Sequence, residues 1–125
     1  MLNLRSKHSF DDTLQLIKSA IKDNGLNVLF EVNHQQNAKK FDIDMDECTV
    51  LGFGNPQVGS ILMIDNPEVA YELPLRMLIA KDKDGVFVFY NKPTNFTKLY
   101  TISESKHEVL HKMTNLLEKI ASTVI

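Results

Sequence analysis

The chain has 125 residues, of which 43% are hydrophobic and 24% charged, and its formal net charge at neutral pH is −2. This size and composition predict a single domain over residues 1–125 with one hydrophobic core. The charges are interspersed, with Lys39-Lys40 the only adjacent basic pair, so we expect no nucleic-acid partner and no membrane partner. A lone Cys48, no apolar leader and no apolar run of roughly 20 residues together predict a cytoplasmic protein.

The first half of the chain predicts a strand, a helix and a second strand. Residues 2–5 alternate apolar and polar side chains, which is typical of a short strand. Ser9 and Asp12 have the spacing of a capping box, and Asn24-Gly25 is a common helix end, so a helix is expected between them. The run 26–34, "LNVLFEVNH", alternates with period two. It predicts a strand with one inward face that includes Val28, Phe30 and His34.

The second half predicts three more strands and a closing helix. Strand-like runs begin at Cys48, Leu75 and Val86, and the turn at residues 83–85 joins the last two as a hairpin. Apolar residues from Val109 onward fall on one side of a helix that starts near Ser105. The order strand, helix, four strands, helix predicts an α+β fold with a mainly antiparallel sheet and helices on one face.

The stretch "FGNPQVGS" at residues 53–60 has two glycines, Gly54 and Gly59, at the spacing of a phosphate-binding P-loop. A P-loop needs a lysine after the last glycine to neutralise the phosphates, and Ser60 stands there instead. Asn55-Pro56 is better explained as a helix start, because Asn is a favoured cap and Pro suits the first helical position. Such a helix start either binds an anion through free N–H groups or serves only as a tight turn.

Several short motifs together resemble one known family. They are His34 and Ala38, Phe53-Gly54-Asn55-Pro56 with Gly59 and Leu62-Met63, Leu73-Pro74, and a hairpin that ends at Tyr90. In this order they resemble the domain-of-unknown-function family 302, over most of the chain. The resemblance implies a strand-helix-four-strand-helix fold similar to the TATA-binding-protein topology, and a dimer. It assigns no activity.

The chain departs from the family pattern at two places. Asn33 stands before His34 where the family usually has an acidic residue, and Phe41-Asp42 stands where it usually has a glycine. A role for His34 that needs a carboxylate partner is therefore not supported by the resemblance.

A rival motif is the run His107-Glu108-Val109-Leu110-His111, which satisfies the H-E-x-x-H pattern of zinc peptidases. On the closing helix both histidines lie opposite the apolar side, and only residues 112–125 follow to supply a third ligand. We therefore expect no metal site, and at most weak adventitious binding of metal at this helix face. Cys48 has no basic neighbour that would activate it, and we expect no cofactor.

The sequence predicts a homodimer that binds a small polar or anionic ligand without evident catalysis. The candidate binding residues are His34, Gly54, Asn55, Pro56 and Tyr90. His34 and Asn55 are expected to border one pocket, because both follow inward-facing strands. The alternatives are an enzyme of unassigned reaction that uses His34 as general acid or base, and a pure assembly module.

Overall fold

The computed structural model describes all residues from 1 to 125. Its main elements are β1 (Leu2–Arg5), α1 (Phe10–Asp23), β2 (Asn27–Asn33), α2 (His34–Lys39), β3 (Cys48–Gly54), α3 (Pro56–Asp65), β4 (Leu75–Asp82), β5 (Gly85–Tyr90) and α4 (His107–Ala121). Four 3-10 helices complete the chain: η1 (Pro67–Glu72), η2 (Pro93–Lys98), η3 (Glu104–Lys106) and η4 (Ser122–Val124). The predicted order of strand, helix, four strands and helix is confirmed, with short helices in the connections.

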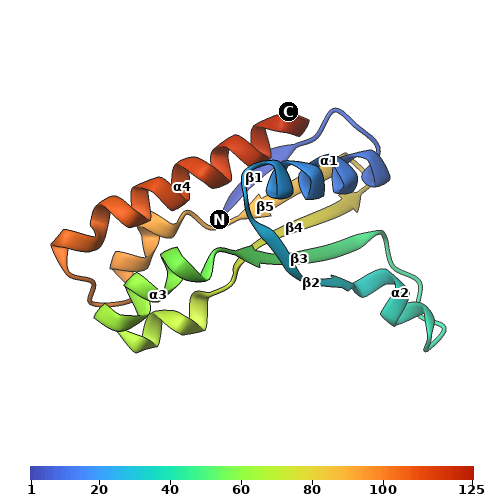
Figure 1. Ribbon diagram of the computed structural model, residues 1–125. Coiled ribbons are helices and arrows are strands. Elements are labelled where there is room, and N and C mark those ends of the chain that lie inside the picture. The colour runs from blue at the N-terminus through green and yellow to red at the C-terminus, as the bar shows by residue number, and fades with distance from the viewer.

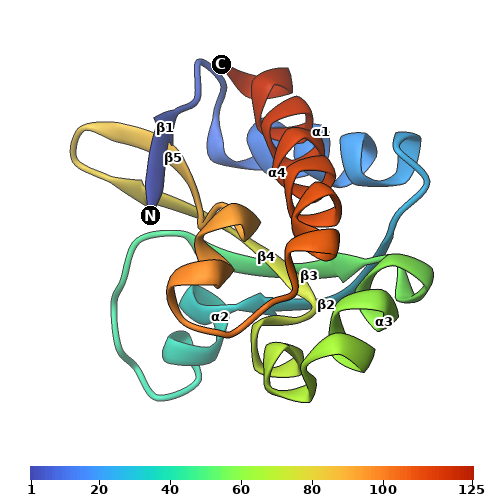
Figure 2. The same ribbon diagram turned by 90° about the vertical axis from the view of Figure 1, so that its left-hand side faces the viewer.

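The five strands form one sheet in the order β1-β5-β4-β3-β2, and every neighbouring pair is antiparallel. The long helices α1 and α4 lie side by side over one face of this sheet (Figure 1). Figure 2 shows α3 at one end of β3 and α2 near the other end. The predicted α+β fold with a mainly antiparallel sheet is therefore confirmed.

Local signals begin and end α1 as expected. The Ser9 hydroxyl accepts a hydrogen bond from the N–H of Asp12, and Gly25 adopts a left-handed φ of 76° after the last turn. One side of α1 is buried, with Ile17 and Ile21 fully so. This amphipathic helix covers the sheet because its apolar side has no other surface to bury against.

A β-bulge in β2 changes which side chains face the core. Val28 pairs with Phe53, but the next pair is Phe30 with Gly52, so Leu29 is the extra residue. The bulge shifts the alternation by one residue, and Phe30 consequently lies on the face away from α1 and α4. The prediction that Val28, Phe30 and His34 share one inward face is therefore wrong.

The two faces of the sheet differ in cover. On the covered face, Leu51, Phe53, Met77, Ile79 and Val88 are fully buried beneath α1 and α4. The opposite side, which we call the open face, carries Phe30, Val32, Val50, Leu78, Phe87 and Phe89, all at least partly exposed. The Phe30 ring lies over Gly52, where an added Cβ would overlap the ring. The open face thus carries several large apolar side chains that α1 and α4 do not cover.

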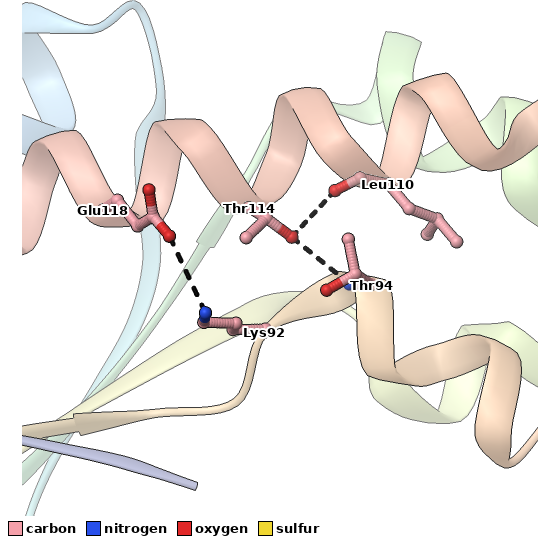
Figure 3. Close-up of polar contacts among 5 residues, drawn as sticks. All are labelled: Lys92, Thr94, Leu110, Thr114 and Glu118. Atoms are coloured by element: carbon pink, nitrogen blue, oxygen red, sulfur yellow. Dashed lines mark hydrogen bonds and ion pairs between the residues drawn. The ribbon is translucent and has the colours of Figure 1, made fainter.

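Polar contacts hold α4 against the chain that leaves β5 (Figure 3). The Thr114 hydroxyl accepts from the N–H of Thr94 at 3.2 Å and donates to the Leu110 carbonyl at 2.9 Å. Lys92 and Glu118 form a looser ion pair at 3.9 Å. These contacts fix the position of α4 over the sheet, and with it the side chains that α4 presents to the site described next.

Candidate functional site

The main pocket lies where β3 ends and α3 begins. It has a volume of about 390 Å³ and is lined by the start of β2, the β3–α3 junction, the segment from η1 to β4, and α4. Most of its walls are apolar, and the larger side chains are Leu26, Leu29, Met63, Leu73, Leu75, Met113 and Leu116. No Asp, Glu, Lys, Arg or His side chain is part of the lining.

Gly54 and Asn55 form the floor at the β3–α3 junction, in agreement with the expectation that this stretch borders a pocket. Asn55 caps α3, because its side-chain oxygen accepts from the N–H of Gln57 at 3.0 Å. Pro56 follows at the first helical position, as expected. An added Cβ at Gly54 would meet no atom within 4 Å, so this glycine faces open space at the pocket.

The start of α3 has few free donors. The N–H of Gln57 is bonded to the Asn55 side chain, and those of Val58 and Gly59 to the Asn55 carbonyl at 3.0 and 3.1 Å. Pro56 has no N–H to offer. The N–H groups that would bind an anion at a helix start therefore already have acceptors within the chain.

Two asparagine side chains supply the polar groups of the pocket. Asn24 donates its Nδ2 to the Ala20 carbonyl at 2.7 Å, which leaves its Oδ1 as an acceptor. Asn55 uses its Oδ1 for the helix cap, which leaves its Nδ2 as a donor. The pocket therefore offers neutral amide groups of both kinds, an acceptor at Asn24 Oδ1 and N–H donors at Asn55 Nδ2, in an apolar surround.

The wall formed by α3 and η1 is tied to the segment that precedes α4. Asp65 accepts hydrogen bonds from both the backbone and the side chain of Ser103, and these bonds hold the pKa of its carboxyl below the ordinary value of 3.8. Asn66 donates to the Thr101 carbonyl at 3.0 Å. Because these contacts join segments far apart in sequence, they position one side of the pocket relative to α4.

His34 lies away from this pocket. Asn33 pairs with Thr49 and Asn27 pairs with Gly54, so His34 and Gly54 are at opposite ends of the β2–β3 ladder. At about 3.4 Å per residue, the ladder separates these ends by roughly 17 Å. His34 is the exposed first residue of α2. The prediction that His34 and Asn55 border one pocket is therefore wrong. Two neighbouring antiparallel strands run in opposite directions, so their last residues lie at opposite ends of the ladder.

Tyr90 is also separate from the main pocket. It is 2% exposed on the covered face and lines a smaller cavity of about 180 Å³ with Glu72 and Arg76. Burial, with a contribution from the charge of Glu118, raises the pKa of the Tyr90 phenol. Of the five candidate residues, the structure therefore brings together Gly54, Asn55 and Pro56.

The H-E-x-x-H run occupies the first turns of α4. The His107 ring bonds to the Ile102 carbonyl through Nε2 at 3.2 Å, and Glu108 pairs with Lys112 at 3.7 Å. His111 is exposed. No group of three or more His, Cys, Asp or Glu side chains is arranged to hold a metal ion.

Sequence reasoning missed most of the apolar walls of the pocket. Leu29, the extra residue of the bulge in β2, is part of the lining, and the sequence did not predict the bulge. Met113 and Leu116 belong to the apolar side of α4, and the sequence gives no sign that part of this side stays uncovered. The one local signal was Gly54-Asn55-Pro56 itself.

Comparison with curated proteins gives partial matches. The chain is 28% identical over 114 residues to "Fluoride-specific ion channel FluC 1" of Brucella suis biovar 1 (strain 1330), covering 90% of this chain and 45% of that protein. The "Fluoride-specific ion channel FluC 1" of Brucella abortus biovar 1 (strain 9-941) is also 28% identical, with 42% of its length covered. The chain thus spans less than half the length of these relatives. None of its own helices is both long and apolar enough to cross a membrane.

Comparison with solved structures and family models gives full-length matches. The crystal structure of an uncharacterized conserved protein DUF302 from Bacillus stearothermophilus has the same fold, with a TM-score of 0.87. The match covers 99% of this chain and 97% of that one at 16% sequence identity. The family model described as "Domain of unknown function DUF302" matches residues 2–120, and the chain therefore belongs to this family.

Proposed function

We propose that this domain binds a small, largely apolar molecule in the main pocket and does not transform it. The observation that carries the proposal is the lining, which is mostly apolar and has no charged side chain. Concave sites of 300–1,000 Å³ with apolar walls and a few polar groups are typical of small-molecule binding. The lining has no acid or base for proton transfer.

The chemistry of the pocket narrows the ligand class. A cavity of about 150 Å³ holds one benzene molecule, so about 390 Å³ accommodates a compound of roughly two rings. The neutral amide groups of Asn24 and Asn55 suit carbonyl, hydroxyl or amide groups of a ligand better than a charged group. We therefore favour a neutral ligand over the anionic one expected from the sequence, because the N–H groups at the start of α3 are already bonded.

A pocket-filling variant tests the proposal. N-phenyl-1-naphthylamine, a neutral two-ring fluorescent probe with one N–H, serves as ligand, and inorganic phosphate serves as the anionic comparison. The wild type should bind the probe and show no thermal shift with phosphate. Gly54→Leu should weaken probe binding at least tenfold, since the new side chain occupies the open space while leaving the fold intact. Fluorescence titration and thermal unfolding provide both readouts.

A control variant distinguishes probe binding in the main pocket from probe binding on the open face. Phe89→Ser removes apolar area from the open face and leaves the pocket lining unchanged, so it should retain probe binding. Probe binding that is unchanged in Gly54→Leu but lost in Phe89→Ser would contradict the proposal. Mass spectrometry monitors whether a bound compound is chemically converted. Conversion that is lost in His34→Ala would instead favour the alternative in which the chain is an enzyme that uses His34.

We also propose that the domain is a homodimer that uses the open face. Phe87 and Phe89 lie with Leu78 on this face, whereas the long helices α1 and α4 lie on the opposite face (Figure 1). An exposed apolar area of this kind marks an interaction surface, and a two-fold dimer is the commonest way to bury it.

A further inference from the structure

The segment between α2 and β3 is an exposed arm of alternating character. Residues 41–47, which we call the acidic arm, read "FDIDMDE". Phe41 is 78% exposed, Ile43 is 58% exposed and Met45 is 39% exposed. Four acidic side chains separate or follow them. Phe41, Ile43 and Met45 are thus large apolar side chains that the rest of the chain leaves partly or largely uncovered.

Backbone contacts with α2 hold the arm in place. The N–H groups of Phe41 and Ile43 donate to the Ala38 carbonyl, and Gln35 donates to the Met45 carbonyl at 3.1 Å. Asp42 adopts a left-handed φ of 58°, a conformation that Asp tolerates better than most residues. In Figure 1 the arm and α2 stand on the side of the sheet away from α1 and α4. The apolar side chains are thus presented to the outside on a supported backbone.

We infer that the acidic arm of one copy packs on the open face of a second copy, and that the exchange is reciprocal. This inference rests on the proposed homodimer and specifies how its interface is built. A two-fold axis lets each copy give its arm and receive the partner's arm on the same type of surface. The apolar side chains of the arm and those of the open face are then buried by one association.

Charge complementarity supports this partner. The arm carries Asp42, Asp44, Asp46 and Glu47. The open face carries two arginines, one toward each end: Arg5 beside Phe87, and Arg76 opposite Gly52. Arg76 has one acidic neighbour at 3.6 Å, and Arg5 has none within ion-pair distance. The negative charge of the arm complements these two arginines, which favours this docking over two faces meeting directly.

The size of the open face also favours a docked arm. Five strands at a spacing of about 4.8 Å span about 19 Å, and six residues along a strand at about 3.4 Å span about 20 Å, which gives the face an area of about 400 Å². Residues 44–47, which follow the turn at residues 40–42, reach about 13 Å across it at roughly 3.3 Å per residue. A stable interface buries about 800 Å² on each partner, so the face alone is too small. The two arms supply the additional area.

Sedimentation across a concentration series tests the inference with matched variants. The double variant Phe41→Ser with Ile43→Ser removes the arm's apolar side chains, and Phe89→Ser alters the face that receives them. Each should raise the dimer Kd at least tenfold. Ile64→Ser is the control, because Ile64 is 85% exposed on α3 and belongs to neither surface. It should leave the Kd unchanged, and circular dichroism should show that all variants remain folded.

Photo-crosslinking locates the contact directly. A benzophenone amino acid at position 41 should form a crosslink between two chains, mapped by mass spectrometry to residues 76–89. A wild type that remains monomeric at all concentrations would overturn both the homodimer and this inference. A wild-type dimer weakened by Phe89→Ser but not by the arm variant would overturn the arm inference and leave the homodimer standing. Crosslinks within one chain would likewise overturn it.

Discussion

The two faces of the sheet have similar side chains but opposite surroundings. Leu51 on the covered face is 0% exposed beneath the helices, whereas Leu78 on the open face, which pairs with the adjacent residue Val50, is only half-buried. The difference arises because α1 and α4 both lie on the same side of the sheet (Figure 1). An apolar strand residue therefore contributes to stability here according to the layer above it, and its residue type alone does not determine that contribution.

The largest expected effect comes from truncating leucines on the two faces. Leu51→Ala leaves a cavity in a fully buried position and should lower the free energy of unfolding by about 2–5 kcal/mol. Leu78→Ala should cost less than half as much at concentrations where the chain is monomeric, because the site is already partly hydrated. Urea denaturation of both variants measures the difference. Equal losses would show that the open face is covered within one chain.

A second prediction concerns the contact between Phe30 and Gly52 on the open face. Gly52→Ala places a Cβ where the Phe30 ring lies, so the ring must move, at a cost of about 1–3 kcal/mol. In a Phe30→Ala background the same change should cost much less, with a coupling free energy of about 0.5–3 kcal/mol. A double-mutant cycle by thermal or urea unfolding measures it. Additive losses in the free energy of unfolding would show that the position of the Phe30 ring does not require a glycine at position 52.

The smallest expected effect concerns two threonines, one on the covered face and one on the helix above it. The Thr49 hydroxyl is buried without a hydrogen-bond partner, so Thr49→Val should raise the free energy of unfolding by about 1 kcal/mol. Thr13 is the matched control, because its hydroxyl is bonded to Ser6 at 2.6 Å. Thr13→Val should therefore lower stability by a similar amount. A loss in both variants would reveal an unseen partner for Thr49.

Local sequence signals determined the starts of α1 and α3 and the hairpin of this protein. Ser9 and Asn55 each bond to a nearby backbone N–H, so their capping roles depend only on residues two or three positions away. The hairpin at residues 83–85 likewise follows from local turn chemistry. These interactions are complete within a few residues, which is why the sequence was sufficient to predict them.

The tertiary structure alone decided where the site lies. His34 and Gly54 follow similar strand patterns, but the antiparallel register places them at opposite ends of a ladder. The bulge at Leu29 moves Phe30 to the open face, and no local residue pattern predicts this bulge. The pocket walls from α4 and η1 meet Asn55 only through long-range packing. Register, bulges and packing depend on residues distant in the chain, and periodicity within one segment does not specify them.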